Sequence, residues 1–310
     1  MRRLWPGSGW PAPLLMLIST LSFATMALCV KWASTRYDYG VAEVITARGL
    51  VGVIILGAQA LWRGQSLRTP VPVMHAWRAI FGVSSLALWF YAISQLPLAT
   101  AVTMNYMSSI WLAIFLAAGG LISGARVDAR LIAVVFVGFS GVVLVLRPTM
   151  PDGALWAVLS GLCSGMIAAM AYLQVSALGR IGEPTWRTVF YFSGLTTLSG
   201  LAACLLAPLW QGAAQVRPLE SLLHSTPGGV LALIGAGVFA TAGQMLLTVA
   251  YTRGQPMVNA SLQYTGIVFS LIYGVVLFGD AVTPGALIGL ALIVAAGITA
   301  TRLRSQHKAA

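Results

Sequence analysis

The chain is organised around ten apolar stretches of about twenty residues, separated by short polar connections. A hydrocarbon core about 30 Å thick takes roughly 20 helical residues at a rise of about 1.5 Å per residue. Strands of a membrane barrel would alternate polar and apolar residues over about ten positions, and these stretches do not. The pattern therefore predicts an all-α integral membrane protein with ten transmembrane helices. We expect them at residues 12–33, 41–62, 76–95, 98–119, 130–147, 154–177, 186–208, 229–250, 257–278 and 284–301.

Composition and charge support this class. Hydrophobic residues make up 58% of the 310 residues and charged residues 8%, whereas roughly a quarter of the residues of soluble domains are charged. The net charge of +11 comes from basic residues in the connections and at the ends of the spans, which argues against a nucleic-acid-binding surface. With a cytoplasmic N-terminus, thirteen basic residues fall on the cytoplasmic side and four on the other, which is the positive-inside bias. We expect a multi-pass protein of the cell inner membrane, with both termini cytoplasmic and no nucleic-acid partner.

The basic residues divide as follows. The cytoplasmic set is Arg2, Arg3, Arg63, Arg68, Arg78, Arg126, Arg130, Arg180, Arg187, Arg253, Arg302, Arg304 and Lys308. The opposite set is Lys31, Arg36, Arg147 and Arg217. The basic start Met1-Arg2-Arg3 and the apolar run after it favour an uncleaved first helix over a signal peptide, because the run is near full spanning length.

The two halves of the chain resemble each other, weakly in sequence and more clearly in hydropathy. Residues 19–24 align with 160–165, and the turn at 91–97 resembles the turn at 251–256. Five crossings in each half place the second half in the opposite sense to the first, an architecture found in many secondary transporters. We therefore expect two inverted five-helix repeats, residues 1–150 and 151–310.

Three segments carry a resemblance to the EamA-type ten-helix permeases of the drug/metabolite transporter superfamily: 92–101, 253–260 and the Leu-Phe-Gly-Asp turn at 277–280. The resemblance covers essentially the whole chain. Asp280 stands where the family often has Glu, and Gly124 occupies the corresponding acidic position in the first half. Ser108 and Ser270 lie where the family often has a proline in spans four and nine, which leaves a helix break there open.

The resemblance implies a secondary transporter for a small organic metabolite, such as an amino acid, a vitamin, or a nucleotide-derived or drug-like solute. It implies alternating access, with export favoured because many relatives are exporters. A metabolite importer or a facilitated-diffusion carrier of the same fold is the alternative. A membrane-embedded enzyme and a channel-like or scaffold protein are the alternatives of another class.

Polar residues in spans four, eight and nine are the candidates for substrate binding. An amide in hydrocarbon needs a hydrogen-bond partner, so these helices should face protein or water. Hydrogen bonding between helices would account for them, but their corresponding placement in the two halves favours a site near the midplane. An aromatic residue near the end of span three belongs either to the interfacial belt or to a surface that stacks the solute. The candidates are Asn105, Tyr106, Ser109, Gln244, Gln263, Tyr264 and Trp89.

Glu43 and Arg48 in span two are the candidates for gating or coupling. A charge at a helix centre costs roughly 2.5–3.5 kcal/mol, so each needs an explanation. Glu43 lies within a turn of the outer end and either reaches the interface or carries a proton. Arg48 lies deeper and either hydrogen-bonds within the bundle or binds a substrate carboxylate. By contrast, three basic residues near span ends should extend to the interface as anchors, namely Lys31, Arg78 and Arg187.

Enzyme signatures are missing from the sequence. The seven acidic residues are dispersed, and His75, His224 and His307 are placed in loops or tails. The phosphate-binding pattern Gly-x-x-x-x-Gly-Lys-Ser/Thr does not occur. We expect a protein that is not an enzyme, with no cofactor or metal and with a small-molecule substrate. Protons are the candidate coupling ion, with facilitated diffusion as the alternative.

Overall fold

The computed structural model describes residues 9–124, 128–148, 153–211, 226–279 and 281–309. Several residues considered above lie outside these ranges, namely Met1, Arg2, Arg3, Arg126, Arg217, His224 and Asp280. The regular structure within the ranges is helical throughout. The helices are α1 Ala12–Arg36, α2 Val41–Trp62, α3 Pro72–Gln95, α4 Leu98–Tyr106, α5 Ser108–Ser123, α6 Ala129–Leu146, α7 Leu155–Arg180, α8 Thr185–Gln211, α10 Pro227–Arg253, α11 Pro256–Gln263, α12 Thr265–Phe278 and α13 Pro284–Ala309.

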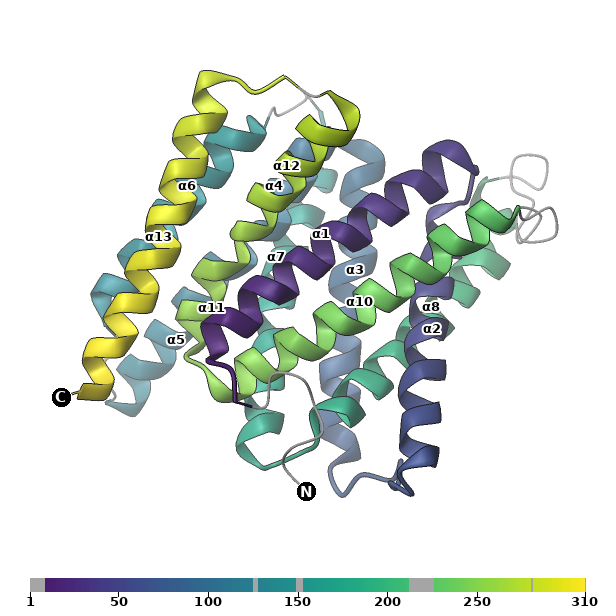
Figure 1. Ribbon diagram of the computed structural model, residues 1–310, viewed down its shortest axis with the longest axis horizontal. Coiled ribbons are helices and arrows are strands. Elements are labelled where there is room, and N and C mark those ends of the chain that lie inside the picture. Colours follow the sequence, from purple (N-terminus) through teal and green to yellow (C-terminus); the bar gives the residue numbers. More distant parts are fainter. Residues whose placement is uncertain (1–8, 125–127, 149–152, 212–225, 280, 310) are drawn as a thin grey trace.

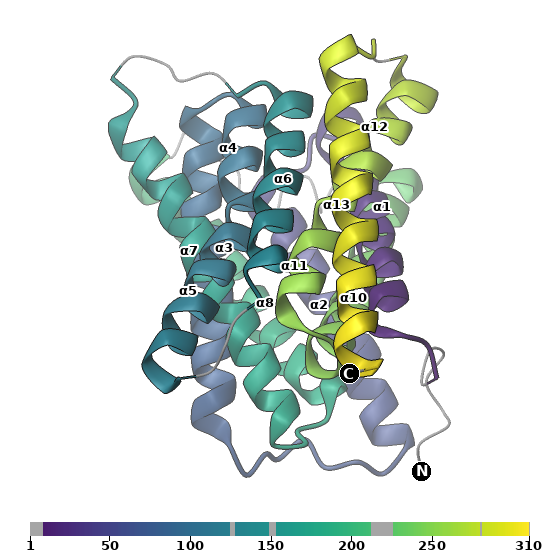
Figure 2. The ribbon, with the colours of Figure 1, turned by 90° about the vertical axis from the view of Figure 1, so that its left-hand side faces the viewer.

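These helices form ten segments that are long and apolar enough to cross a membrane. The all-helical fold with ten crossings is therefore confirmed. Helices α4 and α5 together form one crossing, and α11 and α12 form another. The first turn of α1 and the last turn of α13 lie at the same end of the bundle in both views (Figures 1 and 2), as an even number of crossings requires.

Proline and glycine mark several helix ends. Pro72 and Pro256 stand at the start of α3 and α11, where the missing N–H would have had no partner inside the helix. Gly124 ends α5 with φ of 70°, and Gly279 ends α12 with φ of 69°. This left-handed conformation carries little strain for glycine. The crossings that correspond in the two halves thus end in the same way.

His75 lies in the first turn of α3 and is buried, so its placement in a loop is wrong. The expected span began at residue 76, where the apolar run begins. The helix starts earlier because Pro72 and Val73 form its first turn. Polar residues at a helix end do not register in a hydropathy pattern, although they belong to the helix.

Two crossings are interrupted within the bundle. The first is divided at Met107, between α4 and α5, and the second at Tyr264, between α11 and α12. Both residues keep right-handed angles, with φ and ψ of −61° and −13° at Met107 and −59° and −22° at Tyr264. Neither interruption carries a proline, and neighbouring helices approach both points closely. At the first, a side chain on Gly165 of α7 would strike the carbonyl oxygen of Met104.

The helices pair across the two halves of the chain. Helix α1 packs mainly on α10, and α7 packs mainly on α3. The first crossing of each half thus lies against the third crossing of the other. Helix α2 packs on α8, and α6 packs on α13. At the last interface, a side chain on Gly141 or Gly289 would strike the other residue's carbonyl oxygen, so these backbones lie in close contact.

Candidate functional site

Polar residues beside the first interruption contact helices of the second half. The Nδ2 atom of Asn105 in α4 donates to the Oγ atom of Ser164 in α7 at 3.3 Å. The hydroxyl of Ser109 in α5 donates to the backbone carbonyl of Ala260 in α11 at 2.9 Å. Ser109 and Ser164 are almost fully buried. Both hydrogen bonds join residues before 150 to residues after 151, so they lie at the interface of the two halves.

The two tyrosines at the interruptions face each other. The ring centres of Tyr106 and Tyr264 lie 6.0 Å apart, with the planes tilted by 58°. Tyr264 is fully buried. Its ring occupies the space left by the missing side chain of Gly138 in α6, and Phe139 lies beside it at 6.4 Å between ring centres. The ring of Tyr264, at the second interruption, is therefore packed against Tyr106, Gly138 and Phe139.

Gln263 extends this polar cluster toward α7 and α10. Its Nε2 atom donates to the hydroxyl of Tyr251 in α10 at 3.1 Å. The ring of Tyr251 stacks on Tyr172 of α7, with centres 5.2 Å apart and planes 7° from parallel. Five of the expected substrate-binding residues thus gather at the two interruptions: Asn105, Tyr106, Ser109, Gln263 and Tyr264.

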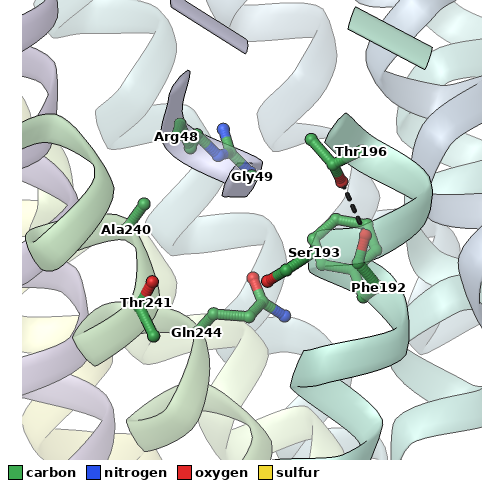
Figure 3. Close-up of a pocket in the computed structure, with 8 residues that line it drawn as sticks. All are labelled: Arg48, Gly49, Phe192, Ser193, Thr196, Ala240, Thr241 and Gln244. Atoms are coloured by element: carbon green, nitrogen blue, oxygen red, sulfur yellow. Dashed lines mark hydrogen bonds between the residues drawn. The ribbon is translucent and has the colours of Figure 1, made fainter. Parts of the chain in front are cut away.

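Gln244 and Arg48 lie in a separate narrow pocket between α2, α8 and α10 (Figure 3). Ser193, Thr196 and Thr241 supply hydroxyl groups to its wall. In Figure 3 the side chains of Gln244 and Ser193 extend toward one another. The cavity has a volume of about 10 Å³, which holds about one water molecule. The pocket in this conformation is too small for an organic solute.

The remaining two candidates contact backbone groups. The indole of Trp89 in α3 donates to the carbonyl of Ala101 in α4 at 3.1 Å, which ties these helices together. The carboxylate of Glu43 accepts a hydrogen bond from the backbone N–H of Gly40 at 2.8 Å, and its side chain is buried. An acid in this position stabilises the first turn of α2, because it satisfies an N–H group that the helix leaves free.

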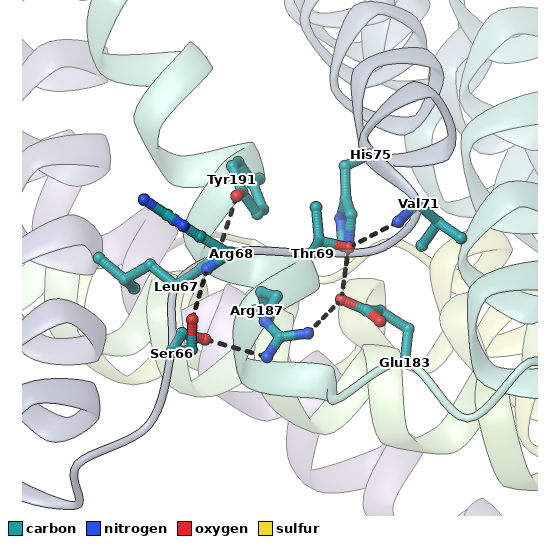
Figure 4. A network of polar contacts seen from close by, with 9 residues as sticks. All are labelled: Ser66, Leu67, Arg68, Thr69, Val71, His75, Glu183, Arg187 and Tyr191. Carbon is teal, nitrogen blue, oxygen red and sulfur yellow. Dashed lines mark hydrogen bonds and ion pairs between the residues drawn. The ribbon is translucent and has the colours of Figure 1, made fainter.

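A polar network that the sequence analysis missed joins the two halves at one end of the bundle (Figure 4). Glu183, between α7 and α8, accepts from the Thr69 hydroxyl at 3.0 Å and from Arg187 Nη1 at 2.9 Å. His75 Nε2 lies 3.0 Å from the same Glu183 oxygen. Arg187 also donates through Nη2 to the carbonyl of Ser66. The connection between α2 and α3 is therefore held to the start of α8.

The charge of Glu183 fits these contacts. Burial raises the pKa of its carboxyl, but the hydrogen bonds from Arg187, His75 and Thr69 outweigh burial and lower the pKa below its ordinary value. The carboxylate is therefore ionised at neutral pH and pairs with Arg187. Arg187 was expected to extend to the interface as an anchor; its side chain is 13% exposed and is held in this pair.

Arg78 also departs from expectation. It was expected to reach the interface, but it is only 3% exposed. Its guanidinium carbon lies 4.3 Å from the ring centre of Phe192 in α8. The Nε and Nη1 atoms have no hydrogen-bond partner. Gly82, one turn further along α3, leaves room for the guanidinium and the Phe192 ring.

Nothing in the described part of the chain resembles a metal centre. No group of three or more His, Cys, Asp or Glu side chains there is close enough to hold an ion. The polar groups gathered between the halves are hydroxyls, amides and guanidinium groups. This chemistry suits hydrogen bonding and the binding of anions.

Comparison with known proteins gives consistent matches over nearly the whole chain. The EamA-like transporter family matches residues 10–147 and again residues 153–301. A pseudopaline exporter of Pseudomonas aeruginosa is 27% identical over 293 residues, covering 94% of this chain and 96% of that protein. A riboflavin transporter of Rhizobium johnstonii is 23% identical over 304 residues, covering 96% and 93%. A protein crystal structure with 22% identity has a TM-score of 0.78 and covers 95% of this chain and 98% of its own, which shows a shared fold.

Proposed function

The chain belongs to the EamA-like transporter family, and from this premise we propose that it is a secondary transporter that moves a small organic solute across the inner membrane, between its two halves. The observation that carries the proposal is the meeting of buried polar groups from both halves at the two helix interruptions. Asn105 bonds to Ser164 there, and Ser109 bonds to Ala260.

Such contacts suit a transport route because they are weak enough to exchange. Hydrogen bonds between helices in membrane proteins contribute about 0.6 kcal/mol on average. A solute that offers its own donors and acceptors can replace them at little cost in free energy. The amide of Gln263 and the hydroxyl of Tyr251 form a further hydrogen bond between helices, α11 and α10 of the second half.

The two halves, residues 1–150 and 151–310, are proposed to be repeats of opposite orientation. The family matches each half separately, and the first crossing of each half packs on the third crossing of the other. The interruptions at Met107 and Tyr264 also correspond. Repeats of this kind support alternating access, because one half can move relative to the other around a site at their interface.

The structure represents a closed conformation in this proposal. The Glu183 network holds the connection between α2 and α3 to the start of α8, and the Arg48 pocket has room for about one water molecule. We place the network at the cytoplasmic mouth, with both termini on that side. Rocking of the halves would break the network, open this mouth and admit or release the solute.

Export is favoured over uptake, and the relative described as a pseudopaline exporter supports this direction. Uptake of a vitamin-like solute is the second candidate, supported by the relative described as a riboflavin transporter. Transport is driven either by proton coupling through Glu43 or by facilitated diffusion down the solute gradient, and the two alternatives are tested against each other. A membrane-embedded enzyme, a channel and a scaffold are the competing classes.

Counterflow into liposomes separates these classes. The purified full chain is reconstituted, loaded with members of a metabolite panel, and exposed outside to traces of the same labelled compound. A transporter gives saturable accumulation that a second substrate inhibits. Unsaturable flux would indicate a channel, and the absence of flux for every compound would contradict the proposed function.

A further inference from the structure

Arg78 is a buried cation without a counter-ion in the described part of the chain. Both ion pairs found there involve Glu183, and neither includes Arg78. Its Nε and Nη1 atoms are enclosed and have no hydrogen-bond partner. Burial of an unpaired charge is strongly unfavourable, so such a group is normally paired or bound to a ligand. The unused hydrogen-bonding capacity is therefore the feature that needs an explanation.

The surroundings of Arg78 hold its guanidinium plane without using its donors. Phe192 offers the face of its ring, 4.3 Å from the guanidinium carbon. The missing side chain of Gly82 gives both groups the space that this stacking needs. Stacking uses the face of the guanidinium and none of the N–H groups at its edge, of which those at Nε and Nη1 are enclosed without a hydrogen-bond partner in this conformation. That edge matches the geometry of a carboxylate or a phosphate, each of which accepts two parallel hydrogen bonds.

A series of neighbouring residues connects Arg78 to the polar cluster at the helix interruptions. It lies near Tyr172, whose ring stacks on Tyr251, and Tyr251 accepts a hydrogen bond from Gln263. Phe192 also lines the pocket of Arg48. Phe192 therefore contacts Arg78 and borders the pocket that holds Arg48.

We propose that Arg78 binds an anionic group of the transported solute, a carboxylate, while the Phe192 ring holds the guanidinium in place. This inference rests on the proposed transport function and adds the chemical class of the substrate. A phosphate presents similar acceptors, so the experiment includes both anions. Arg48 would receive the anion next as it moves past Phe192.

Matched probes test the charge requirement directly. The purified full chain is melted in detergent with phenylacetate, with its neutral amide phenylacetamide, and with inorganic phosphate, each over a range of concentrations. The proposal predicts that phenylacetate raises the melting temperature in a saturable way and that phenylacetamide does not. A shift with phosphate alone would assign the site to phosphate and overturn the carboxylate. Equal shifts with acid and amide, or no shift with either anion, would overturn the proposal.

Variants assign the effect to Arg78. Arg78→Gln should weaken phenylacetate binding about 10- to 100-fold, because the lost hydrogen bonds are charge-assisted. The affinity of Arg78→Lys for phenylacetate should lie between those of Arg78→Gln and the wild type. Arg63→Gln, at an exposed position after α2, removes the same charge and should leave binding unchanged. The melting temperature without probe is measured for each variant as the readout of a structural role. A large drop in melting temperature together with unchanged binding would show a structural role and overturn the proposal.

Transport distinguishes this inference from the proposed function. If the wild-type chain gives saturable counterflow of neutral or cationic compounds only, it is a transporter and the carboxylate site is overturned. If carboxylates are carried and Arg78→Gln abolishes their flux while Arg63→Gln does not, both proposals are supported. If no compound is carried although phenylacetate binds through Arg78, the transport function fails and the anion site stands.

Discussion

The rings of Tyr106 and Tyr264 lie 6.0 Å apart across the interface of the two halves. Each stands at an interruption of a membrane-crossing helix, and neither interruption involves a proline. An interruption without a proline keeps its backbone N–H groups, whereas a proline removes one hydrogen bond of the helix permanently. The tyrosine pair is therefore placed where movement of one half would be transmitted to the other.

Removal of the amide groups should weaken solute binding. Asn105→Ala deletes the donor to Ser164 of the other half, and Gln263→Ala deletes the donor to Tyr251 in α10; one hydrogen bond contributes about 0.5–1.5 kcal/mol. Each variant should lower the apparent affinity in counterflow by about 2- to 12-fold. Ser140→Ala is the control, since Ser140 bonds only to its own helix at an exposed position. Unchanged affinity in both amide variants would reject this site.

A side chain at Gly138 should displace Tyr264. The missing Cβ atom leaves the space that the Tyr264 ring occupies, and overpacking of this kind typically costs about 1–3 kcal/mol. Gly138→Ala should lower both the melting temperature and the flux. Gly119→Ala is the matched control, because an added Cβ there meets no atom within 4 Å and alanine favours the helix. Equal behaviour of the two variants would contradict the packing argument.

The Glu183 network should give acid-sensitive stability. The folded protein holds the pKa of this carboxyl below its ordinary value of 4.5. The contribution to stability is therefore fully present above the unfolded pKa and is lost as pH falls through the folded pKa. Melting temperatures measured from pH 7 downward should fall more in the wild type than in Glu183→Gln. Parallel curves for the two proteins would show that the network does not contribute in this way.

Glu43→Gln tests proton coupling. The substituted amide keeps an oxygen that can accept from the N–H of Gly40, so the first turn of α2 should persist. If Glu43 carries the proton, flux driven by a pH gradient is lost and solute exchange continues. We measure both in the same liposomes. If Glu43→Gln keeps both the pH-driven flux and the solute exchange, transport occurs by facilitated diffusion or uses another proton carrier.

The sequence predicts the crossings well because the bilayer imposes their length and hydropathy. All ten expected segments correspond to membrane-length helices, and the polar pairs Asn105-Tyr106 and Gln263-Tyr264 could be recognised from their corresponding placement. The interruptions at Met107 and Tyr264 could not be assigned, since neither residue has a distinctive backbone preference. They depend on neighbouring helices, such as α7 at Gly165.

The charged residues were harder to interpret for the same reason. Distance from the span end suggested that Arg78 would reach the interface, but Phe192 and Gly82 provide a buried place for it. His75 and Glu183 are 108 residues apart in sequence and meet only in the fold. The useful signal was Pro72, since a proline at the first position of α3 brings His75 into the helix.

The most direct test of the central claim is to lock the mouth closed by the Glu183 network. Thr69→Cys and Glu183→Cys are combined in a chain whose own cysteines, Cys29, Cys163 and Cys204, are replaced by alanine. A short cleavable crosslinker joins the two new thiols, and the single-cysteine variants receive the same treatment as controls. If transport requires movement of the halves, crosslinking abolishes counterflow and cleavage of the crosslinker restores it. Undiminished flux through the crosslinked protein would contradict the account.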